Sequence, residues 1–211
     1  MPLYDFFAPA YDPAFEPIYL PFRKRALEML PAMEGATVLE LACGTGQNFP
    51  LLAARIGGQG KIIGVDISAG MLRTAGRRVK RAALPNVSLC QMDATNLSTA
   101  AFQAQTGLSA VDFVVCTYGF TTMSAWETAF HTSWDLLKPG GGYLIHDVHA
   151  ERRSWRVFAV ELATRCNFLH RVWRPLQDRC IDFRMDYIEP SAHLFAGRLF
   201  VAYGTKPPIM T

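Results

Sequence analysis

The feature that most constrains the fold of this chain is the stretch VLELACGTGQNF at 38–49. Its first half is apolar apart from Glu40, as in a buried strand, and two glycines follow directly. Gly44 and Gly46 permit a tight turn that brings the backbone close to a ligand, and the helical spacing that follows would point free N–H groups at the same place. Such a unit is typical of open α/β sheets that bind ligands beyond the carboxyl ends of their strands.

Short apolar runs alternate with helix-length amphipathic segments along most of the chain. Runs typical of strands lie at 36–41, 61–67, 86–92, 111–118 and 142–148. Helical spacing covers Phe49–Arg55, Met71–Arg81 and Trp126–Leu137, and the breaker LKPGGG ends the last of these. Strands joined through helices imply right-handed crossovers and a mostly parallel sheet covered on both faces, so we expect a Rossmann-like, doubly wound α/β fold.

The C-terminal part of the chain predicts three more elements. These are a long helix over Ser154–Val172 and two strands, over Cys180–Ile188 and Gly197–Tyr203. The link at 190–192 is short, so the two strands should pair antiparallel and complete a seven-stranded sheet whose last pair is antiparallel. With 211 residues, the chain has room for one sizeable domain, which would bury roughly 70% of its unfolded surface.

Composition narrows the class of protein. Half of the residues are apolar, 18% are charged and the mean hydropathy is +0.11, which suits a soluble α/β protein. No apolar run reaches the roughly 18 residues of a membrane span, and the first residues lack a basic secretory start, so we expect a cytoplasmic protein. The five cysteines are widely spaced with no C-x-x-C pair, which predicts reduced thiols and no metal site.

The net charge is only +3, but the cations gather in two segments. Residues 72–84 hold five Arg or Lys and no acid, and residues 151–184 hold eight Arg against four acids. Such segments are either solvated helix faces or surfaces for an acidic membrane or an anionic substrate, so peripheral membrane contact stays open. The small net charge argues against nucleic acid as a partner.

An acidic residue follows the glycine turn at a distance typical of nucleoside sites. Asp66 ends the second expected strand, twenty residues after Gly46, where a carboxylate can accept both hydroxyl protons of a ribose. It could instead cap the next helix, with Ser68 as the rival cap. Phe49 stands where a dinucleotide loop would place its third glycine, which weakens a pyrophosphate interpretation and favours a single nucleoside.

These motifs resemble, in order and over about residues 36–148, the class I S-adenosylmethionine-dependent methyltransferases. The resemblance rests on ELACGTG at 40–46, VDIS at 65–68, QMDA at 91–94 and LLKPGG at 136–141. It implies S-adenosylmethionine as the cofactor, with Glu40 near the methionine ammonium, Asp66 on the ribose and the pair Asp93 and Ala94 beside adenine. Ala42 stands where most of the family has Gly, as in the branch that resembles ubiquinone and menaquinone methyltransferases.

The resemblance also divides the chain and completes the expected cofactor site. Residues 1–30 would form an aromatic lid or helix, 36–148 the cofactor-binding core, and 151–211 a substrate-side helix with the final strands. The residues expected to bind the cofactor are Glu40, Ala42, Gly44, Gly46, Asp66, Ile67, Met71, Asp93, Ala94 and Thr117.

The run YDPAFEPIYLPFRKRAL at 11–27 is similar to the Y-D-x-x-F start of bacterial phosphatidylethanolamine N-methyltransferases and quinone methyltransferases. In those relatives the tyrosine at the position of Tyr11 lies near cofactor and substrate. The resemblance therefore implies a role for Tyr11 in catalysis and a lipid headgroup as one candidate acceptor.

Methyl transfer is an in-line displacement with a neutral leaving group, so positioning alone can lower much of the barrier. A hydroxyl or acidic carbon as acceptor would need a base near the end of the fourth or fifth strand. Tyr118 ends the fourth strand, at the family position that faces the methyl group, although it could equally be strand packing. The fifth strand offers His146, Asp147 and His149, and strand alternation places the two histidines on opposite faces. Of these residues, Tyr118 and His146 are the expected catalytic ones.

Four functions stay open on the sequence alone. The first is methylation of a small amine, phenol or quinone-like acceptor, and the second is methylation of a phospholipid headgroup at a membrane surface. The third is transfer of the aminocarboxypropyl group of the same cofactor. The fourth, a nucleoside-binding module without catalysis, has no support from the intact loop and acids.

Overall fold

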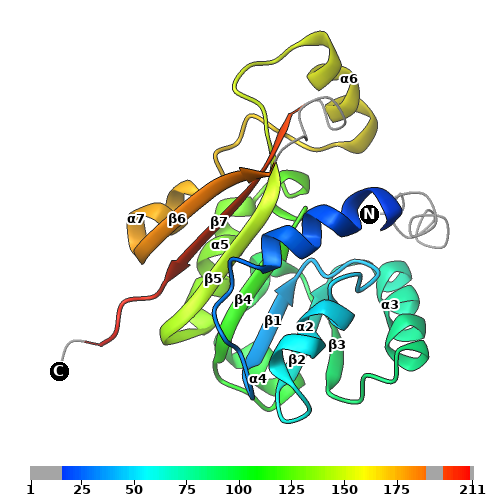
Figure 1. Ribbon diagram of the computed structural model, residues 1–211, viewed down its shortest axis with the longest axis vertical. Helices are drawn as coiled ribbons and strands as arrows, with labels where there is room; N and C mark the ends of the chain where they lie inside the picture. The colour runs from blue at the N-terminus through cyan, green and yellow to red at the C-terminus, as the bar shows by residue number, and fades with distance from the viewer. Residues whose placement is uncertain (1–15, 189–196, 210–211) are drawn as a thin grey trace.

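The computed structural model describes residues 16–188 and 197–209, in which strands and helices alternate as the sequence predicts (Figure 1). A helix over residues 16–27 comes first. The strands are β1 (Thr37–Leu41), β2 (Lys61–Asp66), β3 (Val87–Gln91), β4 (Val111–Thr117), β5 (Leu137–His149), β6 (Ile181–Ile188) and β7 (Arg198–Thr205). The helices are α2 (Phe49–Ile56), α3 (Ala69–Arg81), α4 (Thr99–Thr106), α5 (Trp126–Leu136), α6 (Trp155–Thr164) and α7 (Arg174–Arg179), with two 3-10 helices, η1 (Ala94–Asn96) and η2 (Phe120–Thr122).

All seven strands belong to one sheet, in the order β3-β2-β1-β4-β5-β7-β6. The first five are parallel, and β7 pairs antiparallel with both β5 and β6. This confirms a Rossmann-like, mostly parallel sheet whose last strand pair is antiparallel. The chain winds outward from β1 toward β3 and then from β4 toward the other edge, so the topological switch point lies beyond the carboxyl ends of β1 and β4.

Strand alternation sorts the core into two apolar layers. Leu144 and Val148 of β5 belong to the cluster that includes the helix over 16–27, α2 and α3, whereas Tyr143 and Ile145 belong to the cluster that includes α4, α5 and α7. The helices therefore cover both faces of the sheet (Figure 1). No helix in the described ranges combines the length and apolar character needed to cross a bilayer.

The expectations for two helices are wrong. The helix expected over Ser154–Val172 ends at Thr164, where Arg165 has left-handed backbone (φ 58°) and donates its N–H to the carbonyl of Glu161. Gly or Asn usually takes that position, so the sequence carries no stop signal there. The chain then turns back, and the N–H of Ala150 donates to the carbonyl of Phe168 (2.8 Å). The sequence analysis missed α4, because Phe102 is its one buried residue and its apolar periodicity is weak.

The breaker LKPGGG does end the helix before it, but it does not delay the next strand. Although the strand was expected at 142–148, β5 already begins at Leu137. Backbone bonds hold this entry to the sheet: Gly140 donates to the carbonyl of Lys206, and Lys206 donates to that of Gly141.

Candidate active site

The glycine turn after β1 forms one wall of a cavity of about 300 Å³ beyond the carboxyl ends of β1, β2 and β4. Gly44 (φ 56°) has open space where a side chain would lie, so a ligand can approach its backbone. Gly46 (φ 74°) is turned the other way, and a Cβ there would lie 2.4 Å from the ring of Phe49. Gly44 therefore borders the cavity as predicted, whereas Gly46 shapes the turn without lining it.

Ala42 also has left-handed backbone (φ 53°), a conformation that strains residues with a side chain. This is the physical reason why glycine is common at that position in the resembled family. The methyl group of Ala42 occupies space next to Gly119, where an added Cβ would lie 2.9 Å from it and 2.7 Å from the Cys116 Sγ. Ala42 and Gly119 therefore form a complementary pair at the base of the cavity.

Most of the residues expected to bind the cofactor are brought together around this cavity. Its lining includes Ala42, Gly44, Asp66, Ile67, Met71, Asp93, Ala94 and Thr117. Glu40 and Gly46 are the two of the expected set outside the lining. Tyr11, expected to act in catalysis, lies outside the described residues.

Asp66 is held by backbone donors rather than serving as a helix cap. Its Oδ2 accepts from the Gly44 N–H (2.8 Å) and its Oδ1 from the Ser68 N–H (2.9 Å). Ser68 is the N-cap of α3 and accepts from the Met71 N–H. These bonds fix the carboxylate at the cavity wall, where its remaining lone pairs can accept hydroxyl protons.

Asp93 both lines the cavity and caps a helix. Its Oδ1 accepts from the backbone N–H (2.9 Å) and the hydroxyl (2.8 Å) of Thr95, and so it caps η1. The cap holds Ala94 at the cavity wall.

A buried polar network lies beside the cavity, centred on Asn48 and Thr117. Asn48 Nδ2 donates to Glu40 Oε1 (2.8 Å) and to Thr117 Oγ1 (2.9 Å). Arg23, from the helix over 16–27, donates to Asn48 Oδ1 (3.2 Å) and to Thr117 Oγ1. The network thus links a buried carboxylate to two residues, Arg23 and Thr117, that line the cavity.

Glu40 is the buried carboxylate of this network. It is 1% exposed, and its Oε2 has no hydrogen-bond partner among the described residues. Burial raises the pKa of Glu40 to about 7, although Arg23 and the bond from Asn48 oppose the shift. A buried carboxylate oxygen without a partner fits the ammonium group of a methionine moiety, which would satisfy it and favour its charged form.

The sequence analysis missed Arg23 and Asn48. Arg23 shares the buried face of its helix with Ala26 and Leu27, at positions three and four residues on. An arginine at a core position of an amphipathic helix was the available signal, because such a residue needs a buried partner.

Tyr118 and His146 form a hydrogen-bonded pair at the end of β4. His146 Nδ1 lies 2.7 Å from the carbonyl oxygen of Phe200, which can only accept, so Nδ1 carries the proton. Nε2 is then an acceptor, and the Tyr118 hydroxyl 2.7 Å away donates to it. Burial, with Arg23 as a further cause, lowers the pKa of His146 to about 3, so the imidazole is neutral at physiological pH.

Tyr118 lines the cavity, whereas His146 is completely buried and reaches the cavity only through Tyr118. Tyr118 has left-handed backbone (φ 55°), a strain of the kind that gathers at functional sites. Its ring lies 4.7 Å from that of Tyr19, and the Arg23 guanidinium lies 4.8 Å from its centroid. Tyr118 also packs against the apolar layer that contains Leu144 and Val148, so it combines a packing contact with a place at the cavity wall.

The other two candidate residues of β5, Asp147 and His149, have structural contacts. Asp147 accepts from the N–H and the hydroxyl of Thr121 and so fixes η2, and burial raises its pKa to about 6. His149 packs edge-on against Trp173 at 4.7 Å. Leu144 and Val148, which share the face of His146, lie in one apolar layer, and Trp173 lies in the other, so the two histidines do occupy opposite faces.

The sheet order and a ligand cavity at the switch point define the class as a Rossmann-like α/β nucleoside-binding fold. Residues 38–141 match a family model described as a methyltransferase domain. The demethylmenaquinone methyltransferase of Listeria welshimeri is 27% identical over 143 residues, which span 66% of this chain and 58% of that protein. The 2-phytyl-1,4-naphtoquinone methyltransferase of Nostoc sp. is 28% identical over 200 residues, or 92% of this chain and 82% of that one.

Solved structures agree on the fold. A DhpI–SAH complex is similar with a TM-score of 0.66 at 22% identity and covers 98% of this chain and 94% of that one. Geranyl diphosphate C-methyltransferase from Streptomyces coelicolor is similar with a TM-score of 0.73 at 14% identity and covers 89% and 76%. The chain belongs to the class I S-adenosylmethionine-dependent methyltransferase family, and its cofactor is S-adenosylmethionine. It spans about 58% of the length of the Listeria relative.

Proposed function

We propose that this protein transfers the methyl group of S-adenosylmethionine to a small, uncharged acceptor with a phenolic or quinol hydroxyl. The observation that carries the proposal is the Tyr118 hydroxyl, which is held by neutral His146 at the cavity wall beside the Glu40 network. When bound, the cofactor supplies an electrophilic methyl group on a sulfonium whose leaving group departs neutral. The rest of the mechanism is positioning by this chain.

The proposed cofactor contacts follow the polar groups around the cavity. Asp66 would hold the ribose hydroxyls, and Asp93 with Ala94, Ile67 and Met71 would surround the adenine. Glu40 would hold the methionine ammonium, for which its unpartnered oxygen is the supporting observation. Arg23, a cation at the same end of the cavity, would hold the methionine carboxylate.

Tyr118 is the proposed acceptor-binding group. Because its proton is donated to His146 Nε2, its oxygen keeps lone pairs that can accept the hydroxyl proton of an acceptor. The low pKa of His146 disfavours full proton transfer to the imidazole, so the pair orients the acceptor hydroxyl, whose proton is released to solvent water as the methyl group bonds to the oxygen. His146 is therefore a positioning residue that acts through Tyr118.

Two observations favour a phenol or quinol over an amine as the acceptor. Arg23 lies over the Tyr118 ring, where its charge would repel an ammonium group and stabilise negative charge that develops on a phenol oxygen. The two curated relatives described above are named for quinone acceptors. Methylation of an amine or a phospholipid headgroup, and aminocarboxypropyl transfer, stay predictions of the sequence.

An acceptor comparison tests the proposal. The protein and S-adenosylmethionine are incubated with a short-chain naphthoquinol, with ethanolamine or with phosphatidylethanolamine. The masses of the products are then measured by mass spectrometry. We expect a naphthoquinol product heavier by one CH₂ unit and no such change in the amines. Methylation of an amine alone, or a product that carries the aminocarboxypropyl group, would overturn the proposed acceptor.

A further inference from the structure

The helix α6 presents large apolar side chains to solvent. Trp155 is 76% exposed, Phe158 is 54% exposed and Leu162 is 72% exposed. They follow one another at intervals of three and four residues, so they form one stripe along the helix, which we call the α6 stripe. Seven large hydrophobic residues are exposed among the described residues, and three of them make up this stripe.

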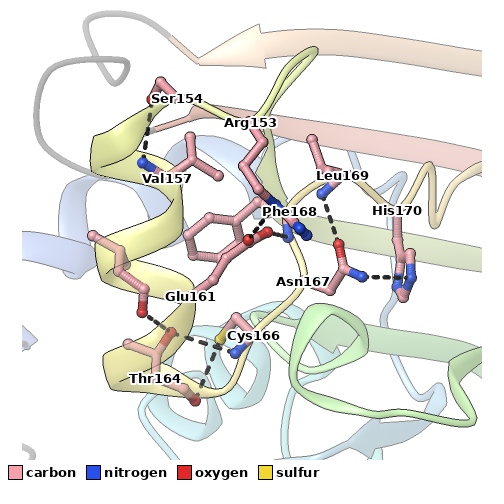
Figure 2. A network of polar contacts seen from close by, with 11 residues as sticks. Arg153, Ser154, Val157, Glu161, Thr164, Cys166, Asn167, Phe168, Leu169 and His170 are labelled. Carbon is pink, nitrogen blue, oxygen red and sulfur yellow. Dashed lines mark hydrogen bonds and ion pairs between the residues drawn. The ribbon is translucent and has the colours of Figure 1, made fainter.

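The opposite face of α6 is fixed to the protein, which sets the direction of the stripe. Val157 (2% exposed) and Glu161 (8% exposed) are buried on it. Figure 2 shows Glu161 between Arg153 (3.2 Å) and the backbone N–H of Phe168 (2.9 Å), while Ser154 caps the helix through the Val157 N–H. These bonds tie the helix to the returning segment, so the α6 stripe cannot turn inward without breaking the bonds of the buried Glu161 carboxylate.

Positive charge surrounds the α6 stripe. Arg152, Arg156 and Arg165 are exposed and form no ion pair with any described residue, and the Arg156 guanidinium lies 5.5 Å from the Trp155 ring centroid. The acids of the same stretch are Glu151 and Glu161, of which Glu161 is paired with Arg153. An apolar stripe with an aromatic residue and flanking arginines is complementary to the interface of an anionic bilayer, where apolar groups enter the headgroup region and arginines meet lipid phosphates.

The α6 stripe lies near the cavity at the same end of the sheet. In Figure 1, α6 stands beyond the carboxyl end of β5. The segment that returns from it bonds to the cavity wall, since the N–H of Asn167 donates to the carbonyl of Thr121 (2.7 Å) and the next residue, Thr122, lines the cavity. A bilayer bound at α6 would therefore adjoin the entrance through which an acceptor reaches Tyr118.

From these observations we infer that α6 docks this protein on the surface of an anionic lipid bilayer through Trp155, Phe158 and Leu162. The inference extends the proposed function, because it gives a hydrophobic acceptor a route from the bilayer to the site. The lipid-binding surface itself does not depend on which acceptor is methylated.

Vesicle co-sedimentation at low salt tests the inference with the full chain. We expect the wild type to sediment with vesicles of phosphatidylcholine and phosphatidylglycerol in equal parts, and far less with phosphatidylcholine alone. The Trp155→Ser/Phe158→Ser/Leu162→Ser variant should lose about tenfold or more of this binding. The Ile181→Ser/Ile209→Ser variant, which removes exposed apolar side chains elsewhere, should bind as the wild type does.

Charge has its own matched pair of variants. Arg152→Glu/Arg156→Glu should weaken binding to the anionic vesicles, whereas Arg77→Glu/Lys80→Glu makes the same charge change on exposed positions of α3 and should weaken it much less. Equal loss in both pairs would mean attraction by overall charge and would overturn docking at α6.

Two controls keep the outcome separate from folding and from the proposed function. Calorimetry with S-adenosylhomocysteine should show wild-type affinity in the triple serine variant, and its activity on a water-soluble naphthoquinol should be unchanged. Docking is overturned if the wild type does not sediment, if the triple variant sediments equally, or if gel filtration shows a dimer that this variant abolishes. Failure of naphthoquinol methylation with intact vesicle binding would instead reject the proposed acceptor alone.

Discussion

The cavity around the glycine turn and the surface of α6 lie at the same end of the sheet but are built in opposite ways. At the cavity, polar groups are buried and held by several bonds each, as Asp66 is by the N–H groups of Gly44 and Ser68. On α6, large apolar groups are exposed and the polar bonds lie underneath, at Glu161. Buried, bonded polar groups can fix the atoms of a small ligand, whereas an exposed apolar surface can bind a larger partner. The cavity is therefore suited to recognising the cofactor, and α6 is suited to the surface that would deliver the acceptor.

The largest effect should come from Asp66, which defines the cofactor half of this comparison. Replacing Asp66 with Ala removes the proposed ribose acceptor and releases two backbone donors, so the affinity for S-adenosylhomocysteine should fall about a hundredfold or more. Isothermal calorimetry measures it. Asp112→Ala is the matched control, because Asp112 bonds to Thr37 and Lys138 away from the cavity, and its affinity should stay within about twofold of the wild type. Unchanged affinity in the Asp66 variant would show that Asp66 does not bind the ribose of the cofactor.

The next effect concerns the acceptor end. Tyr118→Phe deletes the hydroxyl that His146 holds, and kcat should fall about tenfold to a hundredfold while cofactor affinity is preserved. The matched variant is Tyr143→Phe, whose hydroxyl bonds to Ser133 Oγ (2.7 Å) in the opposite apolar layer. Steady-state kinetics with the naphthoquinol compare the two, and an equal loss of kcat would show that Tyr118 has no special role.

Cofactor binding should depend on pH through Glu40. Below its pKa of about 7 the carboxyl is protonated in the cofactor-free protein, so binding an ammonium requires loss of that proton. Between pH 7 and pH 6 the affinity should weaken about fivefold, because the ionised fraction of Glu40 falls by that factor, and Glu40→Gln should bind weakly with a flat profile. A calorimetric pH series checks this, and an equal pH dependence in the variant would assign the proton elsewhere.

Linkage gives the same residue an opposite effect on stability. The pKa of Glu40 is raised by folding, so its contribution to stability is full below its ordinary value near 4.5 and is lost as the pH rises through about 7. Relative to Glu40→Gln, the cofactor-free wild type should therefore lose thermal stability over that window. Melting curves of both proteins follow it without any ligand.

The smallest effect concerns the pair at the base of the cavity. Gly119→Ala places a Cβ 2.9 Å from Ala42 and should destabilise the protein by about 1–3 kcal/mol, as overpacking does. Ala42→Gly relieves left-handed backbone and should be neutral or stabilising by about 1 kcal/mol. Combining them should recover part of the loss in urea unfolding, and simple additivity would mean that the two positions are not coupled.

Parts of the fold and site whose residues lie close together along the chain could be predicted from the sequence, whereas contacts between distant segments could not. The strand, glycine turn and Asp66 lie within 38–66 and carry their signals in order, so the sheet and most of the cavity lining followed from the sequence. The network of Arg23, Asn48 and Thr117 joins three segments that are distant along the chain, and although Thr117 was expected at the site, its bonds to the other two depend on the fold. The end of α6 was predicted wrongly for a different reason. Arg165 adopts a left-handed backbone conformation, which arginine rarely takes, so its identity does not predict the end of a helix. The burial of His146 behind Tyr118 likewise depends on β7, whose Phe200 carbonyl orients the ring.

Isotope tracing tests whether a methyl group is transferred at the Tyr118 end of the cavity. The protein is incubated with S-adenosylmethionine carrying a labelled methyl group and with the naphthoquinol, and both products are analysed by mass spectrometry. The account predicts the label in the naphthoquinol and an equal amount of S-adenosylhomocysteine. Formation of methylthioadenosine with the label retained on sulfur would contradict it and indicate transfer of the aminocarboxypropyl group.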